Sequence, residues 1–144
     1  MPDVQDGKPL VLSGHCLCGG VRFRTTGLVR ASGHCHCESC RRAASSPVTT
    51  FFTVPRKGTE LSGESLRYYA SSPGVRRGFC GNCGSPMSFE TERRPEDIDL
   101  YVASLDDGLS VRELQDFTRE KLAQHEFPRI VEFVDELPKS EGGV

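Results

Sequence analysis

Seven cysteines in a chain of 144 residues are the side chains through which this sequence could perform chemistry. They form a first motif, Cys16-Leu17-Cys18, a middle motif, Cys35-His36-Cys37-Glu38-Ser39-Cys40, and a third motif, Cys80-Gly81-Asn82-Cys83. Cysteines spaced in this way are typical zinc ligands: four thiolates close a structural site, whereas three leave a coordination position open for catalysis. The count of seven therefore favours one closed site and one open site.

Disulfide bonds are the competing use of these cysteines. The first residues, MPDVQDGKPLVLSG, lack the basic start and the apolar run of a signal peptide. No apolar stretch reaches the roughly 18 residues that suggest a membrane-spanning helix. We therefore expect a cytoplasmic protein with no membrane partner, in a compartment where thiols stay reduced and closely spaced cysteines more often bind metal.

The spacing within the motifs suggests which thiolates share an ion. On an extended strand, residues i and i+2 lie on the same face, so both cysteines of a Cys-x-Cys pair could face one metal. The third motif suits a tight turn, in which Gly81 and Gly84 would tolerate unusual backbone angles. Because the middle motif already holds three thiolates, the first and third motifs are left to form the site of four. A second pairing stays open, in which Cys37 and Cys40 join the third motif as a zinc ribbon, although residues 41–79 exceed the usual gap of roughly 15 to 20 residues.

Three histidines and one glutamate adjoin the motifs. His34 and His36 would face away from the ligands of the middle motif if they lay on a strand. His15 could donate a hydrogen bond to a sulfur of the first motif, and Glu38 could shuttle a proton. A surface or structural role is the simpler interpretation of all four residues.

Two pairs of arginines also lie near the cysteines. Arg41 and Arg42 follow the middle motif, and Arg76 and Arg77 precede the third. They could offset thiolate charge or bind the carboxylates of a ligand through bidentate contacts. The default for arginine is nevertheless a solvent-exposed face.

The segments that must position these motifs are short and are separated by glycine, proline and serine clusters, which is typical of a mainly β domain. One helical period spans Val111–Leu122, with Ser110 as its N-cap, and a short helical turn is expected after Cys40. We expect strands at Leu10–Leu12, Val21–Thr25, Val48–Val54, Leu66–Ala70, Val75–Phe79, Pro86–Glu90 and Ile98–Ala103.

Length and composition point to one domain. A chain of 144 residues is close to the modal domain size and has no linker-like run, so we expect a single domain over residues 1–144, with a core at about 14–138 and frayed ends. With 36% hydrophobic residues, 8% aromatic residues and no tryptophan, the chain would gain folding free energy from its metal. The formal net charge of -2 would fall to about -5 with seven thiolates and two zinc ions, which disfavours a nucleic-acid partner.

The residues around the three motifs match a known pattern. The matching stretches are Gly14–Phe23, Cys35–Arg41 and Phe79–Ser85, in this order along the chain. Together they resemble the glutathione-dependent formaldehyde-activating family, also called the GFA or CENP-V domain. Weaker similarity continues through Leu105–Asp107 and Asp135–Pro138, so the resemblance covers most of the chain.

The resemblance implies a mainly β, Mss4-like zinc-binding fold with short helical segments and two zinc ions per chain. In the family pattern the structural zinc would be held by Cys16, Cys18, Cys80 and Cys83. The catalytic zinc, and with it the chemistry, would be held by Cys35, Cys37 and Cys40. The implied activity is that of a zinc-dependent carbon-sulfur lyase resembling S-(hydroxymethyl)glutathione synthase, which joins or releases a thiol such as glutathione and a small aldehyde such as formaldehyde.

An open three-thiolate site suits this reaction. Zinc with a free position can bind a thiol and lower its pKa, which gives a thiolate nucleophile near neutral pH. Three thiolates leave the site with a charge of about -1, which weakens its Lewis acidity and favours activation of a thiol over activation of water. The alternative is a non-catalytic zinc-binding module that presents its β-surface to a protein partner. Its second site would be empty, or closed by a fourth ligand such as His34 or His36.

Two departures from the family pattern concern the substrate pocket. The stretch Ala43–Ser46 stands where relatives have a glycine-containing turn. The segment Phe117–Phe133 lacks the histidine-isoleucine and tryptophan pattern of many members. The substrate could therefore differ from formaldehyde.

Overall fold

The computed structural model describes residues 11–106. The helix expected at Val111–Leu122 and the segment Phe117–Phe133 lie outside the described residues. None of the helices within residues 11–106 has the length and apolar character needed to cross a membrane.

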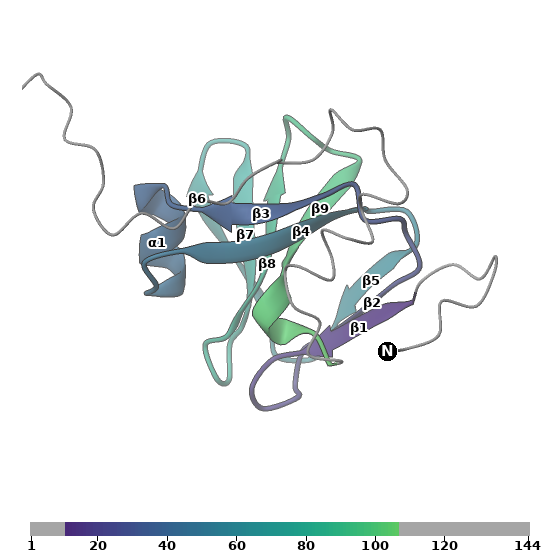
Figure 1. Cartoon of the computed structure of the whole chain (residues 1–144). Helices are drawn as coiled ribbons and strands as arrows, with labels where there is room; N and C mark the ends of the chain where they lie inside the picture. The colour runs from purple at the N-terminus through teal and green to yellow at the C-terminus, as the bar shows by residue number, and fades with distance from the viewer. Residues whose placement is uncertain (1–10, 107–144) are drawn as a thin grey trace, which may run out of the picture.

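Strands make up most of the described chain, as Figure 1 shows, and the predicted mainly β fold with short helical segments is confirmed. The elements in chain order are β1 (Leu12–His15), β2 (Arg22–Thr25), β3 (Ala31–Cys35), α1 (Glu38–Ala44), β4 (Thr49–Pro55), β5 (Thr59–Ser62), β6 (Leu66–Ser72), β7 (Val75–Cys80), β8 (Pro86–Thr91), β9 (Asp97–Tyr101) and the 3-10 helix η1 (Val102–Ser104).

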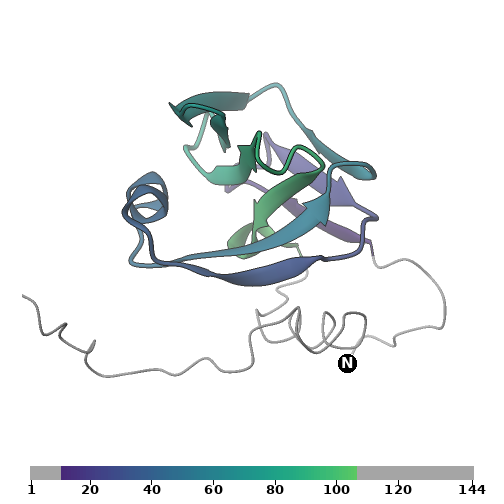
Figure 2. The same ribbon diagram turned by 90° about the horizontal axis from the view of Figure 1, so that it is seen from above.

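The strands form two antiparallel sheets. The small sheet has the order β1-β2-β5, and the large sheet has the order β3-β4-β9-β8-β7-β6. Figures 1 and 2 place α1 at the same end of the large sheet as the β6–β7 hairpin, with the small sheet at the opposite end. The hydrophobic core lies between the sheets, where the rings of Phe23 and Phe52 approach to 6.1 Å between centroids.

The strand register shows which residues of the large sheet lie on its core face and which lie on the opposite face. Because side chains alternate along a strand, residues paired across the ladder share a face. Phe52 pairs with Leu100, and both belong to the core face that packs on the small sheet. Phe51 pairs with Tyr101 on the opposite face. Arg77, which pairs with Phe89, shares that opposite face.

Most of the predicted strands are found within one or two residues of their expected bounds, but two strands were missed. These are β3 and β5, whose sequences ASGHC and TELS show no strong apolar alternation. β3 pairs with the longer β4, and β5 pairs over its full length with β2, so backbone hydrogen bonding rather than side-chain pattern accounts for them. The strand expected at Ile98–Ala103 ends at Tyr101 and continues as η1, and β1 begins at Leu12 rather than ending there.

Helix α1 ends in a strained residue. Ser45 caps its C-terminus with φ 47° and ψ 40°, in the left-handed region, and belongs to the stretch Ala43–Ser46. Glycine adopts this conformation without the steric cost that a side chain brings. We expect Ser45→Gly to raise the free energy of unfolding by up to about 1 kcal/mol, measured by urea denaturation. Ser46→Gly, at a position without positive φ, is the matched control and should not stabilise the protein. Equal effects of the two changes would contradict this explanation.

Candidate metal centres and the adjoining cavity

Two clusters of cysteines could hold metal ions, one of four and one of three. The first is formed by Cys16, Cys18, Cys80 and Cys83, and the second by Cys35, Cys37 and Cys40. In each cluster all sulfur atoms lie within 4.8 Å of one another. The structure thus groups the cysteines as four plus three, and Cys37 and Cys40 do not share a cluster with the third motif as a zinc ribbon would require.

The four-cysteine cluster joins two turns. The first turn follows β1, where the amide of Gly19 donates to the carbonyl of Cys16 at 2.9 Å. The second links β7 to β8, where the amide of Gly84 donates to the carbonyl of Cys80 at 2.8 Å. Gly84 has φ 78°, as its expected role in the turn requires, whereas Gly81 has no positive φ. The Cys-x-Cys pair of the first motif therefore converges in a turn and not along a strand.

Several sulfur atoms of this cluster accept hydrogen bonds, which stabilise the thiolate form that binds metal. The amide of Val21 donates to the sulfur of Cys16 at 3.2 Å, and the side chain of Asn82 donates to Cys18 at 3.6 Å. The hydroxyl of Ser85 lies 3.2 Å from the sulfur of Cys83. Together with the amide of Ser85 it lowers the pKa of Cys83 to about 5. The turns thus supply donors that favour the thiolate form of the ligands.

The three-cysteine cluster lies where β3 meets α1. Cys35 ends β3, Cys37 is the N-cap of α1, and Cys40 lies in the first turn of the helix. The sulfur of Cys37 accepts the amide of Cys40 at 3.4 Å, and this contact lowers the pKa of Cys37. The helical turn expected after Cys40 in fact begins before it, because the middle motif itself supplies the helix N-terminus.

Sulfur spacing in both clusters fits zinc. A tetrahedral ion with zinc-sulfur bonds of about 2.3 Å places its sulfur atoms about 3.8 Å apart. The sulfur of Cys18 lies 3.6 Å from that of Cys16 and 3.7 Å from that of Cys80. In the three-cysteine cluster, Cys35 and Cys37 are 3.5 Å apart. The donor set and the distances therefore suit this metal in each cluster.

A cavity of about 340 Å³ adjoins the three-cysteine cluster. It lies on the face of the large sheet that does not pack on the small sheet, and all six strands of the large sheet contribute to its lining. Its walls include Phe51, Val75, Phe89 and Tyr101, whereas its polar lining includes Arg77. The cluster is thus open toward a half-open, mainly apolar space.

Arg77 is a further functional candidate, although a solvent-exposed face was the default expectation for this arginine. Its side chain is buried, with 8% of its surface exposed, and its Nη1 and Nη2 atoms lie 3.8 and 3.7 Å from the sulfur of Cys40. It also donates to the hydroxyls of Ser39 at 2.9 Å and Ser71 at 3.2 Å. Within residues 11–106 it forms no ion pair with a carboxylate. A buried guanidinium with this environment is poised to balance the charge of a metal-thiolate centre.

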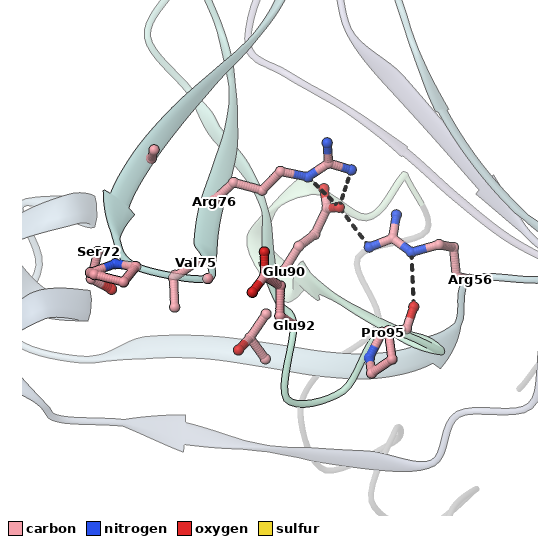
Figure 3. Close-up of a pocket in the computed structure, with 11 residues that line it drawn as sticks. Arg56, Ser72, Val75, Arg76, Glu90, Glu92 and Pro95 are labelled. Carbon is pink, nitrogen blue, oxygen red and sulfur yellow. Dashed lines mark hydrogen bonds and ion pairs between the residues drawn. The ribbon is translucent and has the colours of Figure 1, made fainter.

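Arg76 has a different role because neighbouring residues of a strand face opposite sides. Its Nε and Nη2 atoms donate to Oε2 of the buried Glu90 at 2.8 and 2.6 Å, and Arg56 donates to the same oxygen at 2.6 Å. Figure 3 shows both arginines pointing toward Glu90 across a groove on the core-facing side of β7. Arg76 therefore stabilises a structural ion network and does not contact the cysteines. The alternation along β7 was the sequence signal that could have separated the two arginines.

The other predicted neighbours of the motifs make local contacts. His34 lies 2.9 Å from the hydroxyl of Thr50, and within residues 11–106 neither His34 nor His36 joins the three-cysteine cluster. His15 is exposed, as the simpler interpretation expected, and it donates to the carbonyl of Cys16 at 2.7 Å and contacts Asp106. The exposed Glu38 pairs with Arg42 one helical turn away.

The two clusters should release metal at different pH values. A protonated thiol cannot ligate, so protons displace the metal as the pH falls. Each cluster contains a thiol whose pKa is raised, Cys40 or Cys80, and a thiol whose pKa is lowered, Cys37 or Cys83, so these shifts do not separate the clusters. The number of ligands does separate them, because the three-cysteine cluster holds its ion with one thiolate fewer. Acidification from pH 8 to pH 4 is expected to empty the three-cysteine cluster first, followed with a chromogenic chelator. Release from both clusters in one step would contradict this order.

Comparisons with known proteins agree with these observations. The model of a family described as glutathione-dependent formaldehyde-activating enzyme (GFA) matches residues 11–120. An uncharacterised lyase of Schizosaccharomyces pombe is 36% identical over 76 residues, which cover 53% of this chain. This chain spans only 55% of the length of that relative. A crystal structure of a Rhodobacter sphaeroides protein matches with a TM-score of 0.59 and 25% identity, over 71% of this chain and 94% of the other.

Proposed function

Because this chain belongs to the glutathione-dependent formaldehyde-activating enzyme family, we propose that it is a zinc-dependent carbon-sulfur lyase. The reaction joins a small thiol such as glutathione to an aldehyde, or releases the two from their adduct. The observation that carries the proposal is the three-cysteine cluster open to a cavity of about 340 Å³.

The two cysteine clusters would hold two zinc ions with different roles. Cys16, Cys18, Cys80 and Cys83 would hold a structural zinc, because their four sulfurs complete a tetrahedral set. Cys35, Cys37 and Cys40 would hold a second zinc and leave one position for a ligand. Zinc bound there would take the substrate thiol at the remaining position and lower its pKa, so that the thiol is a nucleophile near neutral pH.

Arg77 tunes the charge of this centre. Three thiolates and one zinc ion carry a net charge of about -1, and a thiolate substrate would add to it. The guanidinium of Arg77, 3.7 Å from the sulfur of Cys40, offsets this charge inside a buried environment where Coulombic interactions are strong. It thus favours binding of the substrate as a thiolate.

The walls of the cavity hold the carbonyl partner away from bulk water. Phe51 and Phe89 supply apolar surface to its lining. Burial raises the pKa of Tyr101, although Arg77 opposes the shift, so the phenol stays protonated at neutral pH and can donate a hydrogen bond. The lining therefore combines exclusion of water with donors for a carbonyl oxygen.

A non-catalytic zinc module would have a second site that is empty or closed by a fourth ligand. Within the described residues the cluster holds three cysteines, His34 contacts Thr50, and a cavity lies at the open side. These features favour a site that admits a ligand.

Exchange NMR of glutathione and formaldehyde with their adduct tests the proposal. The zinc-loaded protein should accelerate the exchange in proportion to its concentration. Exchange at the rate of the protein-free mixture, with formaldehyde and with every other aldehyde tried, would sink the lyase assignment.

A further inference from the structure

The cavity beside the three-cysteine cluster is much larger than formaldehyde needs. One molecule of liquid water takes up about 30 Å³, and formaldehyde has only one heavy atom more. The cavity volume of about 340 Å³ falls instead in the range of small-molecule binding pockets, which starts at about 300 Å³. Formaldehyde and the thiol methylene of glutathione would leave the apolar part of this space unfilled, because the charged groups of glutathione are costly to bury against apolar walls.

The surface of the cavity shows what would fill it. Phe51, Val75 and Phe89 line it from three different strands, β4, β7 and β8. Their side chains lie on the same face of the sheet as Arg77. The pairing of Arg77 with Phe89 across the ladder shows this, because paired residues share a face. An apolar group in contact with these walls is removed from water, which contributes about 25 cal/mol per Å² of apolar surface. The walls therefore suit a hydrocarbon substituent.

Two charged residues interrupt the apolar lining, Arg77 and Asp99, and the carboxylate of Asp99 already accepts hydrogen bonds from Thr53 and Arg94. The guanidinium of Arg77 stacks over the ring of Phe89, with 4.9 Å between its central carbon and the ring centroid. The guanidinium also donates toward the sulfur of Cys40. An oxygen bound to Arg77 would therefore lie close to the three-cysteine cluster. A carbonyl oxygen held there would place its carbon near the open coordination position and its substituent among the aromatic walls.

From this arrangement we infer that the electrophile is an aldehyde with an apolar substituent, whose oxygen is bound by Arg77. The inference rests on the proposed function, since it names the partner of the thiol in the same site. Phe51, Val75 and Phe89 select the substituent, and Arg77 acts as a catalytic residue. The assignment differs from formaldehyde, which has no substituent to fill the apolar space.

The chemical step is an addition without oxidation or reduction. An electron pair of the thiolate sulfur forms the new carbon-sulfur bond, while the π pair of the carbonyl moves to its oxygen. Arg77 stabilises the resulting alkoxide, as donors of an oxyanion hole do. The proton that the thiol lost on binding returns from solvent to this oxygen and gives a hemithioacetal. The reverse step releases thiol and aldehyde.

A panel of aldehydes with glutathione as the common thiol tests the inference by exchange NMR. Phenylacetaldehyde and 2-methylpropanal provide apolar substituents, and glycolaldehyde provides a small polar one. For the wild-type protein we expect kcat/KM to be at least about tenfold higher for the apolar aldehydes, the range that one apolar pocket can supply. Acceleration of formaldehyde and glycolaldehyde exchange equal to that of the apolar aldehydes overturns the inference and leaves the lyase function standing. Acceleration with none of them rejects both.

A pair of variants tests the apolar wall. Phe51→Gln should reduce the preference for phenylacetaldehyde over glycolaldehyde to less than about threefold. Phe51→Leu keeps an apolar side chain at this position and should retain the preference. Equal behaviour of the two variants contradicts a selecting role for Phe51.

Arg77→Gln tests the oxygen site. It should lower kcat about 100-fold for every aldehyde and weaken thiol binding, followed by chemical shift changes, whereas zinc content stays at the wild-type value. Arg77→Lys keeps the charge and should recover part of kcat. Unchanged kcat in Arg77→Gln overturns the assignment of Arg77. If this variant loses zinc, the aldehyde panel and the Phe51 pair still decide the substrate class.

Discussion

Cys80→Ser is expected to leave the chain without a cooperative folded state at 25 °C. Cys80 is fully buried in the hydrophobic core, and its sulfur lies 3.7 Å from that of Cys18. Its cluster links the turn after β1 to the turn between β7 and β8, and so fastens the small sheet to the large one. Structural zinc supplies about 10 to 16 kcal/mol of apparent binding free energy, as much as the whole stability of a typical domain.

The measurement is thermal unfolding by circular dichroism, with zinc present in excess. Wild-type protein should lose its transition when a strong chelator is added and regain it with zinc. Cys80→Ser should show no transition in either condition. A variant that unfolds cooperatively within a few degrees of the zinc-loaded wild type would show that this cluster does not hold the fold together.

Cys37→Ser is expected to abolish catalysis while leaving the fold intact. Serine is a preferred N-cap, so its hydroxyl can take over the hydrogen bond that the sulfur of Cys37 accepts from the amide of Cys40. Hydroxyl is a much poorer zinc ligand than thiolate, so the open cluster should lose its metal. Adduct exchange should fall to the rate of the protein-free mixture, by at least about 100-fold, since the activated thiolate is lost.

His36→Ala is the matched control for this variant. His36 is an exposed neighbour of Cys37 that does not join the cluster within the described residues. It should keep the exchange rate and the metal content of the wild type. A loss of activity in His36→Ala equal to that in Cys37→Ser would mean that the histidine, and not the thiolate alone, is needed for the chemistry.

Much of the candidate site could be predicted from the cysteine spacing, because cysteines so close in sequence tend to bind the same ion. The division into four and three follows from the middle motif, which already holds three sulfurs. The local conformation was harder to predict. The first motif closes a turn rather than a strand, since the amide of Gly19 bonds back to Cys16. A Cys-x-Cys spacing is compatible with both arrangements.

The roles of the arginines depend on strand register, which the sequence of one strand does not contain. Arg76 and Arg77 must face opposite sides, but only the pairing of β7 with β8 tells which side holds the cavity. β3 was missed for a related reason: its residues Ala31–Cys35 are small or polar, and the strand is stabilised by pairing with β4. The face on which each arginine lies and the formation of β3 both depend on pairing between strands, which no local sequence pattern contains.

Native mass spectrometry of the reduced, zinc-loaded protein with glutathione tests most directly whether the three-cysteine cluster holds a metal with a position for thiol. The account predicts two zinc ions and one bound glutathione for the wild type, and one zinc ion without glutathione for Cys37→Ser. A single zinc ion in the wild type, or equal glutathione binding by both proteins, would contradict it.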